Sequence, residues 1–260
     1  MLSASISYRM VADNLDRSLK NTADKPEVAR ETKYYLENIT KVKSVDDFLK
    51  DERLYKYAMK AGGLSDMSYA KAFMRKVLTE GIDKKDSFAN TLADPRYKKF
   101  AETFNFARYG DGAVDFDRVK QGTVNNYVRQ TLEEDAGAQS EGARLALYFE
   151  RMAPNITSAY GLLADKALIQ FVHTAFQIPD ATSLMDIEKQ ADMISQKLDI
   201  ADLKDPEKVK KLINRFTSLY ELNNSTSSTS SGVATLFGQQ GIGISGDVLS
   251  AIQSLKLGGR

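Results

Sequence analysis

A Ser-His-Asp hydrolase site in this chain of 260 residues would depend on its one histidine, and the sequence has no cysteine. His173 lies in the largely apolar stretch 171–176, which reads FVHTAF. A hydrolase triad also needs a serine at a sharp turn and an acid beside the histidine, and the neighbouring sequence offers neither. The pattern favours a histidine in or beside a helical core. The lack of cysteine excludes disulfide scaffolds, cysteine-bound zinc, iron–sulfur clusters and thiol catalysis.

Two further segments carry chemically suggestive spacings. Gly241, Gly243 and Gly246 form the pattern GxGxxG, but a dinucleotide site needs a preceding strand and an acid about 20 residues later. Glu133, Glu134 and Asp135 could act as acid–base groups or bind a cation, yet they follow one predicted helix, and Ser140 predicts the cap of the next. We therefore expect no catalytic, cofactor-binding or metal-binding residue.

The charge balance bears on the class of partner. The chain has 36 basic and 35 acidic residues, whereas a nucleic-acid-binding protein normally has a clear basic excess. Residues 53–57 (RLYKY) and 96–100 (RYKKF) interleave charged and aromatic residues. They fit the solvated face of amphipathic helices whose long basic stems cover apolar surface, with an acidic protein surface as the alternative and nucleic acid disfavoured.

No targeting or membrane segment is expected. Charged residues, among them Arg9 and Asp13, interrupt the first 20 residues, which argues against a cleavable signal peptide. The sequence has no run of about 18 apolar residues that could cross a membrane. Synthesis and folding in the cytoplasm is the default expectation.

Helical periodicity dominates the chain and predicts an all-α protein, a multi-helix bundle. Val28, Thr32, Tyr35, Ile39 and Val42 recur at steps of three and four, as on one helix face. Alternation typical of strands is absent from the sequence. We expect one domain over residues 1–222.

An internal repeat divides that domain into two related halves, 29–108 and 143–222, bridged by a helix at about 115–132. Residues 29–64 and 143–178 align without a gap at an offset of 114, with 8 of 36 positions identical. The phrase Leu-x-Asp occurs four times at predicted helix starts. We interpret its aspartates as N-caps rather than metal or substrate ligands: Asp51, Asp94, Asp165 and Asp205.

The composition changes after Leu222. Residues 223–232 read NNSTSSTSSG, which predicts a flexible linker. The tail 233–260 contains a short amphipathic segment with an apolar face of four candidate partner-binding residues: Val248, Leu249, Ile252 and Leu255. Ten residues are too few to form a stable helix alone, so this segment needs the body of the protein or another molecule, a second copy included.

Residues 130–151, QTLEEDAGAQSEGARLALYFER, resemble one particular family, and the match returns at Leu203-Lys-Asp205-Pro and at Arg215-Phe216. It is an alphaproteobacterial "domain of unknown function" family whose genes lie in flagellar and motility clusters. The resemblance is most distinctive over 130–176 and implies a helical protein linked to the flagellum. It carries no catalytic residue. Within the motif we expect Arg144, Tyr148, Glu150, Arg151 and Tyr160 to be architectural.

Two functions follow as expectations. The first is a non-enzymatic flagellum-associated protein with a structural or assembly role, whose partners are flagellar or export-apparatus proteins. The alternative is a cytoplasmic helical chaperone or regulator that binds a flagellar export substrate in a groove. An enzyme of another type is disfavoured because no catalytic constellation is present.

Overall fold

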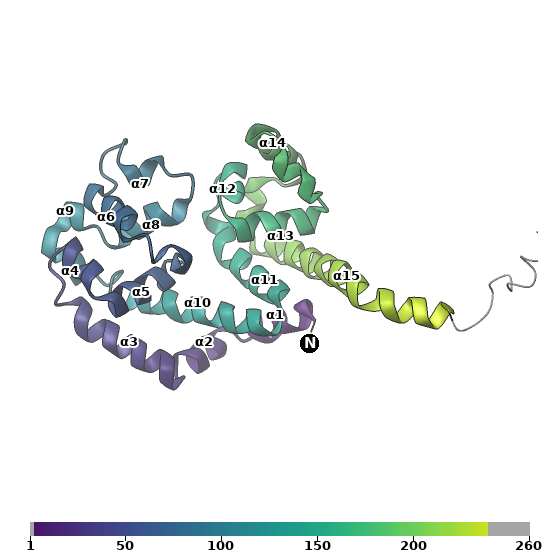
Figure 1. The fold of residues 1–260 in the computed structure, drawn as a ribbon, viewed down its shortest axis with the longest axis horizontal. Coiled ribbons are helices and arrows are strands. Elements are labelled where there is room, and N and C mark those ends of the chain that lie inside the picture. The colour runs from purple at the N-terminus through teal and green to yellow at the C-terminus, as the bar shows by residue number, and fades with distance from the viewer. Residues whose placement is uncertain (1–2, 239–260) are drawn as a thin grey trace, which may run out of the picture.

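The computed structural model describes the backbone of residues 3–238 and the side chains of residues 3–224. Within this part of the chain every regular element is a helix, which confirms the predicted all-α bundle. Figure 1 shows two groups of helices side by side, which we call the first and second lobes. One long helix, α10 (Gln121–Gln139), runs along the base of both.

The first lobe follows the predicted periodicity closely. Proline at the first position starts α3, and Ser44 and Asp51 cap the next two helices. The lobe contains α3 (Pro26–Ile39), α4 (Val45–Lys50), α5 (Glu52–Ala61), α6 (Lys71–Glu80), α7 (Phe88–Thr91), α8 (Pro95–Thr103) and α9 (Phe106–Tyr109), with 3₁₀ turns at Ser65–Met67 and Gly110–Asp115.

The second lobe has fewer and longer connections between its helices. It contains α11 (Glu141–Met152), α12 (Ala159–Leu163), α13 (Lys166–Phe176), α14 (Ile187–Lys197) and α15 (Pro206–Gly238), with 3₁₀ turns at Ala153–Asn155, Asp180–Leu184 and Ile200–Lys204. Ser140 alone separates α10 from α11 and caps the latter. Arg129 of α10 donates to the carbonyl oxygen of Leu147 at 3.1 Å, so α11 runs back along α10 as a tight hairpin.

The first two helices of the chain attach to different lobes. The α1 helix (Ala4–Ala12) packs in the second lobe, where Tyr8 donates to Glu150 at 3.0 Å. The backbone N–H of Ser5 donates to Glu221 at 2.8 Å. The α2 helix (Leu15–Ala23) packs Leu19 and Ala23 against the first lobe.

Buried apolar side chains form two clusters, one in each lobe. The first cluster extends from Val28 to Val128, and the second joins Tyr8 to residues between Ala136 and Phe216. The bridging helix contributes to both. It runs from Gln121 to Gln139 rather than over 115–132, because residues 110–115 form a 3₁₀ turn and Ser140 ends it. Glu133 therefore lies within α10 and not after a helix.

The repeat appears as matching helices at the same offset. The series α3, α4, α5 corresponds in order and length to α11, α12, α13. Ser44 and Ser158 each cap the short middle helix. Tyr35 stacks on Tyr57 with ring centroids 4.5 Å apart, and Phe149 stacks on Phe171 at 3.7 Å.

Both copies also end in the same way. Leu64 N–H donates to the carbonyl of Met59 at 2.8 Å, and Ile178 N–H donates to the carbonyl of His173 at 2.8 Å. This bond is the signature of a left-handed helix cap, which needs a residue at positive φ. The first copy uses Gly63 at φ 69°, whereas the second uses Gln177 at φ 50°.

The two halves diverge after this point, so the correspondence of 29–108 with 143–222 is only partial. Asp94 starts the nine-residue α8, whereas Asp205 precedes the much longer α15. A third ring completes each aromatic stack, and it comes from a helix outside the matched series. The ring centroid of Tyr127 on α10 lies 3.8 Å from that of Tyr57, and the ring centroid of Phe216 on α15 lies 4.2 Å from that of Phe171. In packing, α15 thus takes the place that α10 occupies in the first lobe.

The predicted flexible linker over 223–232 is not a break in the described chain, because α15 continues through it to Gly238. Serine and threonine cost only about 0.5 kcal/mol each relative to alanine in a helix. Extending a helix that is already formed also avoids the cost of a new nucleus. The candidate binding residues Val248, Leu249, Ile252 and Leu255 lie outside the described residues.

Candidate protein-interaction surfaces

The four Leu-x-Asp aspartates all lie at helix N-termini. Asp51 accepts from Leu54 N–H at 3.0 Å, and Asp94 accepts from Arg96 N–H at 2.9 Å. Asp205 accepts from Glu207 N–H at 2.9 Å on an exposed surface. Asp165 accepts from two backbone N–H groups, those of Ala167 and Leu168, and is only 4% exposed. These positions account for the aspartates as helix caps.

Asp165 differs from the other caps because it also joins the two lobes. Its second carboxylate oxygen accepts from Tyr148 at 2.5 Å, as Asp51 accepts from Tyr34 at 2.9 Å in the first copy. Arg96 of the first lobe lies 3.9 Å from the same oxygen of Asp165. Burial alone would lower the pKa of Arg96, but the hydrogen bond and charge of Asp94, with Asp165 adding to them, raise it. Arg96 is therefore a fixed cation at the lobe contact.

A second polar cluster lies between α10 and α11. Glu133 is 1% exposed and accepts from Arg129 at 2.9 Å and from Arg151 at 2.7 Å. Burial lowers the pKa of Arg151, but its hydrogen bonds to Glu133 and the charge of that carboxylate, with Tyr148 and Asp165 adding to them, together raise it. Burial raises the pKa of Tyr8, and the charge of Glu150 adds to the effect. The charges of this cluster compensate one another inside the protein, which fits an architectural role.

Tyr160 departs from its motif neighbours, because it is 51% exposed on α12. Arg144, by contrast, pairs with Glu141 beside it. The sequence motif does not distinguish these residues from one another, whereas the structure buries Tyr148 and leaves Tyr160 at the surface.

His173 is buried on α13, with Asp180 4.0 Å from its Nδ1 atom. Burial lowers its pKa, and the charge of Asp180 opposes that effect only in part. In the described part of the chain no group of three or more His, Cys, Asp or Glu residues is arranged to hold a metal ion.

The two segments of interleaved charged and aromatic residues pack largely within the protein. Tyr97 and Phe100 are buried, and Arg96 donates to the carbonyl of Gly63 at 2.8 Å. A groove of about 490 Å³ lies beside the stacked rings of Tyr57 and Tyr127. The cations that line it are already paired, Arg53 with Glu31 and Lys60 with Glu134, among other contacts.

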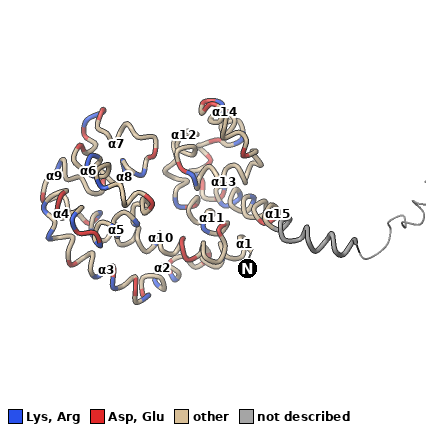
Figure 2. The backbone as a smooth tube through the Cα atoms, viewed as in Figure 1, with Lys and Arg blue, Asp and Glu red and all other residues tan. Residues whose placement is uncertain are grey.

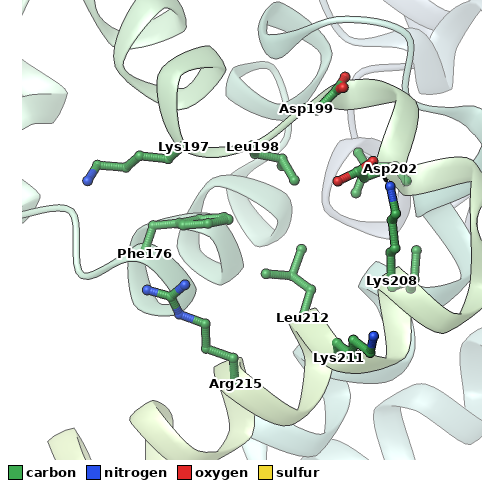
Figure 3. A pocket seen from close by; sticks show the side chains of 11 residues that line it. Phe176, Lys197, Leu198, Asp199, Asp202, Lys208, Lys211, Leu212 and Arg215 are labelled. Atoms are coloured by element: carbon green, nitrogen blue, oxygen red, sulfur yellow. Dashed lines mark hydrogen bonds and ion pairs between the residues drawn. The ribbon is translucent and has the colours of Figure 1, made fainter.

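A different surface, which we call the basic hollow, lies in the second lobe where α13, α14 and α15 meet. Its apolar floor includes Phe176, Leu198 and Leu212, and its volume is about 260 Å³. Figure 3 shows these three side chains around the hollow. Local sequence patterns do not reveal this surface, because its residues come from α13, α14, the 3₁₀ turn Ile200–Lys204 and α15.

Lys197, Lys211 and Arg215 are three of the four cations that line the basic hollow; the fourth is Lys208, and the carboxylates of Asp199 and Asp202 line it as well. The guanidinium of Arg215 lies 5.1 Å from the ring centre of Phe176, as Figure 3 illustrates. Lys208 is paired with Asp202 across the hollow at 2.5 Å. Among the side chains that the structure describes, none of the three cations has a carboxylate within 4.0 Å. The hollow therefore combines an apolar floor with uncompensated positive charge.

Charges elsewhere are mixed. Figure 2 shows acidic and basic residues interspersed along the backbone of both lobes. No helix in the described range is both long enough and apolar enough to cross a membrane.

Comparison with known proteins places this arrangement among uncharacterised relatives. The model of a family described as "Protein of unknown function (DUF1217)" matches residues 61–209. The X-ray crystal structure of protein AGR_C_984 from Agrobacterium tumefaciens is similar, with 48% sequence identity and a TM-score of 0.80. The similarity covers 86% of this chain and 97% of that one. No curated protein matches.

Proposed function

Since this chain belongs to the DUF1217 family, whose function is unknown, we propose its function from its own helices and surfaces. We propose a non-enzymatic protein that acts through protein–protein contacts. We place that role at the bacterial flagellum, in its structure or assembly. The cytoplasmic chaperone or regulator of an export substrate is the second candidate.

The course of α15 carries the proposal of a contact protein. The helix packs Val209, Ile213 and Phe216 into the second core. Figure 1 shows its C-terminal part extending beyond both lobes. Residues 223–232 of this part contain mostly serine, threonine and asparagine, which are modest helix formers. An extended helix of this composition gains stability when it packs against a partner.

The sequence beyond α15 supports the same proposal. Val248, Leu249, Ile252 and Leu255 have the spacing of one apolar helix face. Burying such side chains is worth about 1.5–3 kcal/mol each, enough to offset part of the cost of ordering the segment. These residues are the proposed partner-binding face.

The flagellar assignment rests on the resemblance of residues 130–176 to a family encoded in motility clusters. It is an association of genes, so the test must be physical. In a motile strain that lacks the protein, full-length protein and a truncation after Leu222 would each be expressed with an affinity tag. We expect the full-length protein to restore motility and to travel with basal bodies or export components, and the truncation to do neither.

The tail needs a matched control. A variant with serine at Val248, Leu249, Ile252 and Leu255 tests the apolar face, while a variant with alanine at Ser250 and Ser254 tests the polar face of the same segment. The apolar variant should lose the partner and the polar variant should keep it. Full motility and co-fractionation with the truncated protein would reject the proposal. Recovery only with soluble export substrates would favour the second candidate.

A further inference from the structure

A segment at the opposite end of α14 from the basic hollow combines exposed apolar and acidic side chains. We call residues 180–188 the acidic ridge. Leu184 is 91% exposed and Ile187 is 57% exposed, the former being the most exposed large hydrophobic side chain of the described residues. Asp180, Asp186 and Glu188 flank them at the surface. Exposed apolar side chains next to charged ones are candidates for contact with a partner.

The charges of the acidic ridge are only weakly compensated. Asp186 lies 3.3 Å from Lys189 on the same exposed helix turn. Asp180 faces His173, whose pKa burial lowers, so the imidazole is neutral near neutral pH. Within the described chain Glu188 has no cation within 4.0 Å. The ridge therefore presents net negative charge beside Leu184 and Ile187.

The ridge is held in a defined shape. Gln190 donates to the carbonyl of Met185 at 2.7 Å, and Thr182 donates to the carbonyl of Pro179 at 2.7 Å. Its base is anchored by Ile178, which is buried in the second core. A preorganised segment loses little conformational freedom when it binds.

The ridge and the basic hollow are complementary in charge and occupy different parts of the second lobe. Ile187 of the ridge and Lys197 of the hollow are the first and last residues of α14, so about 15 Å of helix separates them. The hollow offers an apolar floor with three cations that have no carboxylate within 4.0 Å among the described residues, and the ridge offers apolar side chains beside carboxylates that are only weakly compensated. Opposite charge at the rim of an apolar contact selects the partner and its orientation.

We propose that the acidic ridge of one molecule docks into the basic hollow of a second copy of this chain. The two surfaces differ, so the contact is head-to-tail and each molecule keeps one free ridge and one free hollow. Repetition of such a contact builds an open chain or a ring. The hollow is smaller than the ~300–1,000 Å³ of most small-molecule sites, which suits one or two side chains of the ridge.

Sedimentation velocity over a range of concentrations tests the proposal with the full-length protein. We expect the wild-type protein to associate at low ionic strength and to dissociate at about 1 M salt, where the screening length falls to about 3 Å. The Lys197→Glu/Lys211→Glu variant reverses the hollow, and Asp186→Lys/Glu188→Lys reverses the ridge. Each variant alone should associate at least about tenfold more weakly, because like charges then face each other.

An equimolar mixture of the two variants is the decisive measurement. Each variant retains one wild-type surface, so the ridge of the first fits the hollow of the second, and association should return. The Lys84→Glu/Lys85→Glu variant in the first lobe makes the same charge change at an exposed site and should behave like wild type. Circular dichroism would check that each variant is folded. Leu184→Ser should weaken association without any change of charge.

Three outcomes would overturn the proposal. The wild-type protein could remain monomeric at every concentration, both charge reversals could associate normally, or their mixture could stay monomeric although each is folded. The truncation after Leu222 separates this inference from the proposed function, since it removes the tail but keeps ridge and hollow. Loss of self-association in that truncation would assign the contact to the tail and reject the ridge.

Discussion

The hydroxyl group of Tyr148 donates a 2.5 Å hydrogen bond to Asp165, and the same pair exists 114 residues earlier as Tyr34 and Asp51. In each copy the aspartate uses one oxygen to cap a helix and the other to hold a tyrosine of the preceding long helix. The repeat therefore preserves a joint between two helices. The copy in the second lobe is the more buried and also faces Arg96.

Substitution of Asp165 should cost more than that of an ordinary cap. Asp165→Ala leaves two backbone N–H groups and the buried Tyr148 hydroxyl without their acceptor. The expected loss is about 2–4 kcal/mol of unfolding free energy, measured by urea denaturation. Asp205→Ala removes an exposed cap of the same geometry and should cost about 1 kcal/mol. Equal losses for the two variants would show that the tyrosine bond adds nothing.

The left-handed cap of α13 is a site where a substitution should stabilise the protein. Gln177 at φ 50° occupies a conformation that Gly63 occupies at φ 69° in the other copy. Gln177→Gly should raise the unfolding free energy by about 0.5–1 kcal/mol, because relief of backbone strain exceeds the added entropy of the unfolded chain. Gly63→Ala should lower it by about 1 kcal/mol. Thermal melting would check both signs, and destabilisation by glycine at 177 contradicts the argument.

We expect the buried carboxylate of Glu133 to stabilise the fold, because it compensates the charges of the two arginines beside it. Glu133→Ala leaves Arg151 without its carboxylate partner and Arg129 with only Glu150, 3.9 Å away. We expect a loss of about 3–5 kcal/mol in urea denaturation. The exposed pair Lys25–Asp135 offers a control, since Lys25→Ala should cost no more than about 1 kcal/mol. A small effect at Glu133 would mean that water solvates both arginines.

Acid should weaken the second lobe through His173. Burial lowers the pKa of His173 in the folded protein from the ordinary value of 6.5, so the unfolded chain binds the proton more readily. The stability that this contributes is present above about pH 6.5 and is lost as the pH falls below it. His173→Met, which copies Met59 of the first repeat, should flatten the pH dependence between pH 7 and pH 5. Denaturation curves at several pH values would measure it, and an unchanged slope would exclude His173 as the source.

Much of the helical framework could be predicted from local patterns. Ser44, Asp51 and Pro95 mark helix starts because capping is decided within a few residues of the sequence. The offset of 114 residues identified the matched helices of both lobes. Local patterns could not show that Phe216 completes the stack of Phe171, because that contact depends on which long helix fills the space.

The candidate surfaces were harder to predict for the same reason. The basic hollow joins Phe176, Lys197 and Arg215, which lie on three helices and share no spacing in the sequence. The Ser/Thr segment after Leu222 looked like a linker by composition, yet α15 extends through it. Composition reports the helix propensity of isolated residues. Residues that follow a docked helix can instead extend it without the cost of a new helix nucleus.

The attachment of α1 to the second lobe constrains the order in which the chain can fold during synthesis. The N–H of Ser5 bonds to Glu221, so the ends of this contact are 216 residues apart. The first core is complete once Val128 has left the ribosome, whereas Tyr8 must wait for α11 and α15. Domains generally fold as units as they emerge. Residues 4–12 would thus remain without their native contacts while the first lobe forms, and nascent chains stalled before α15 should expose them to protease.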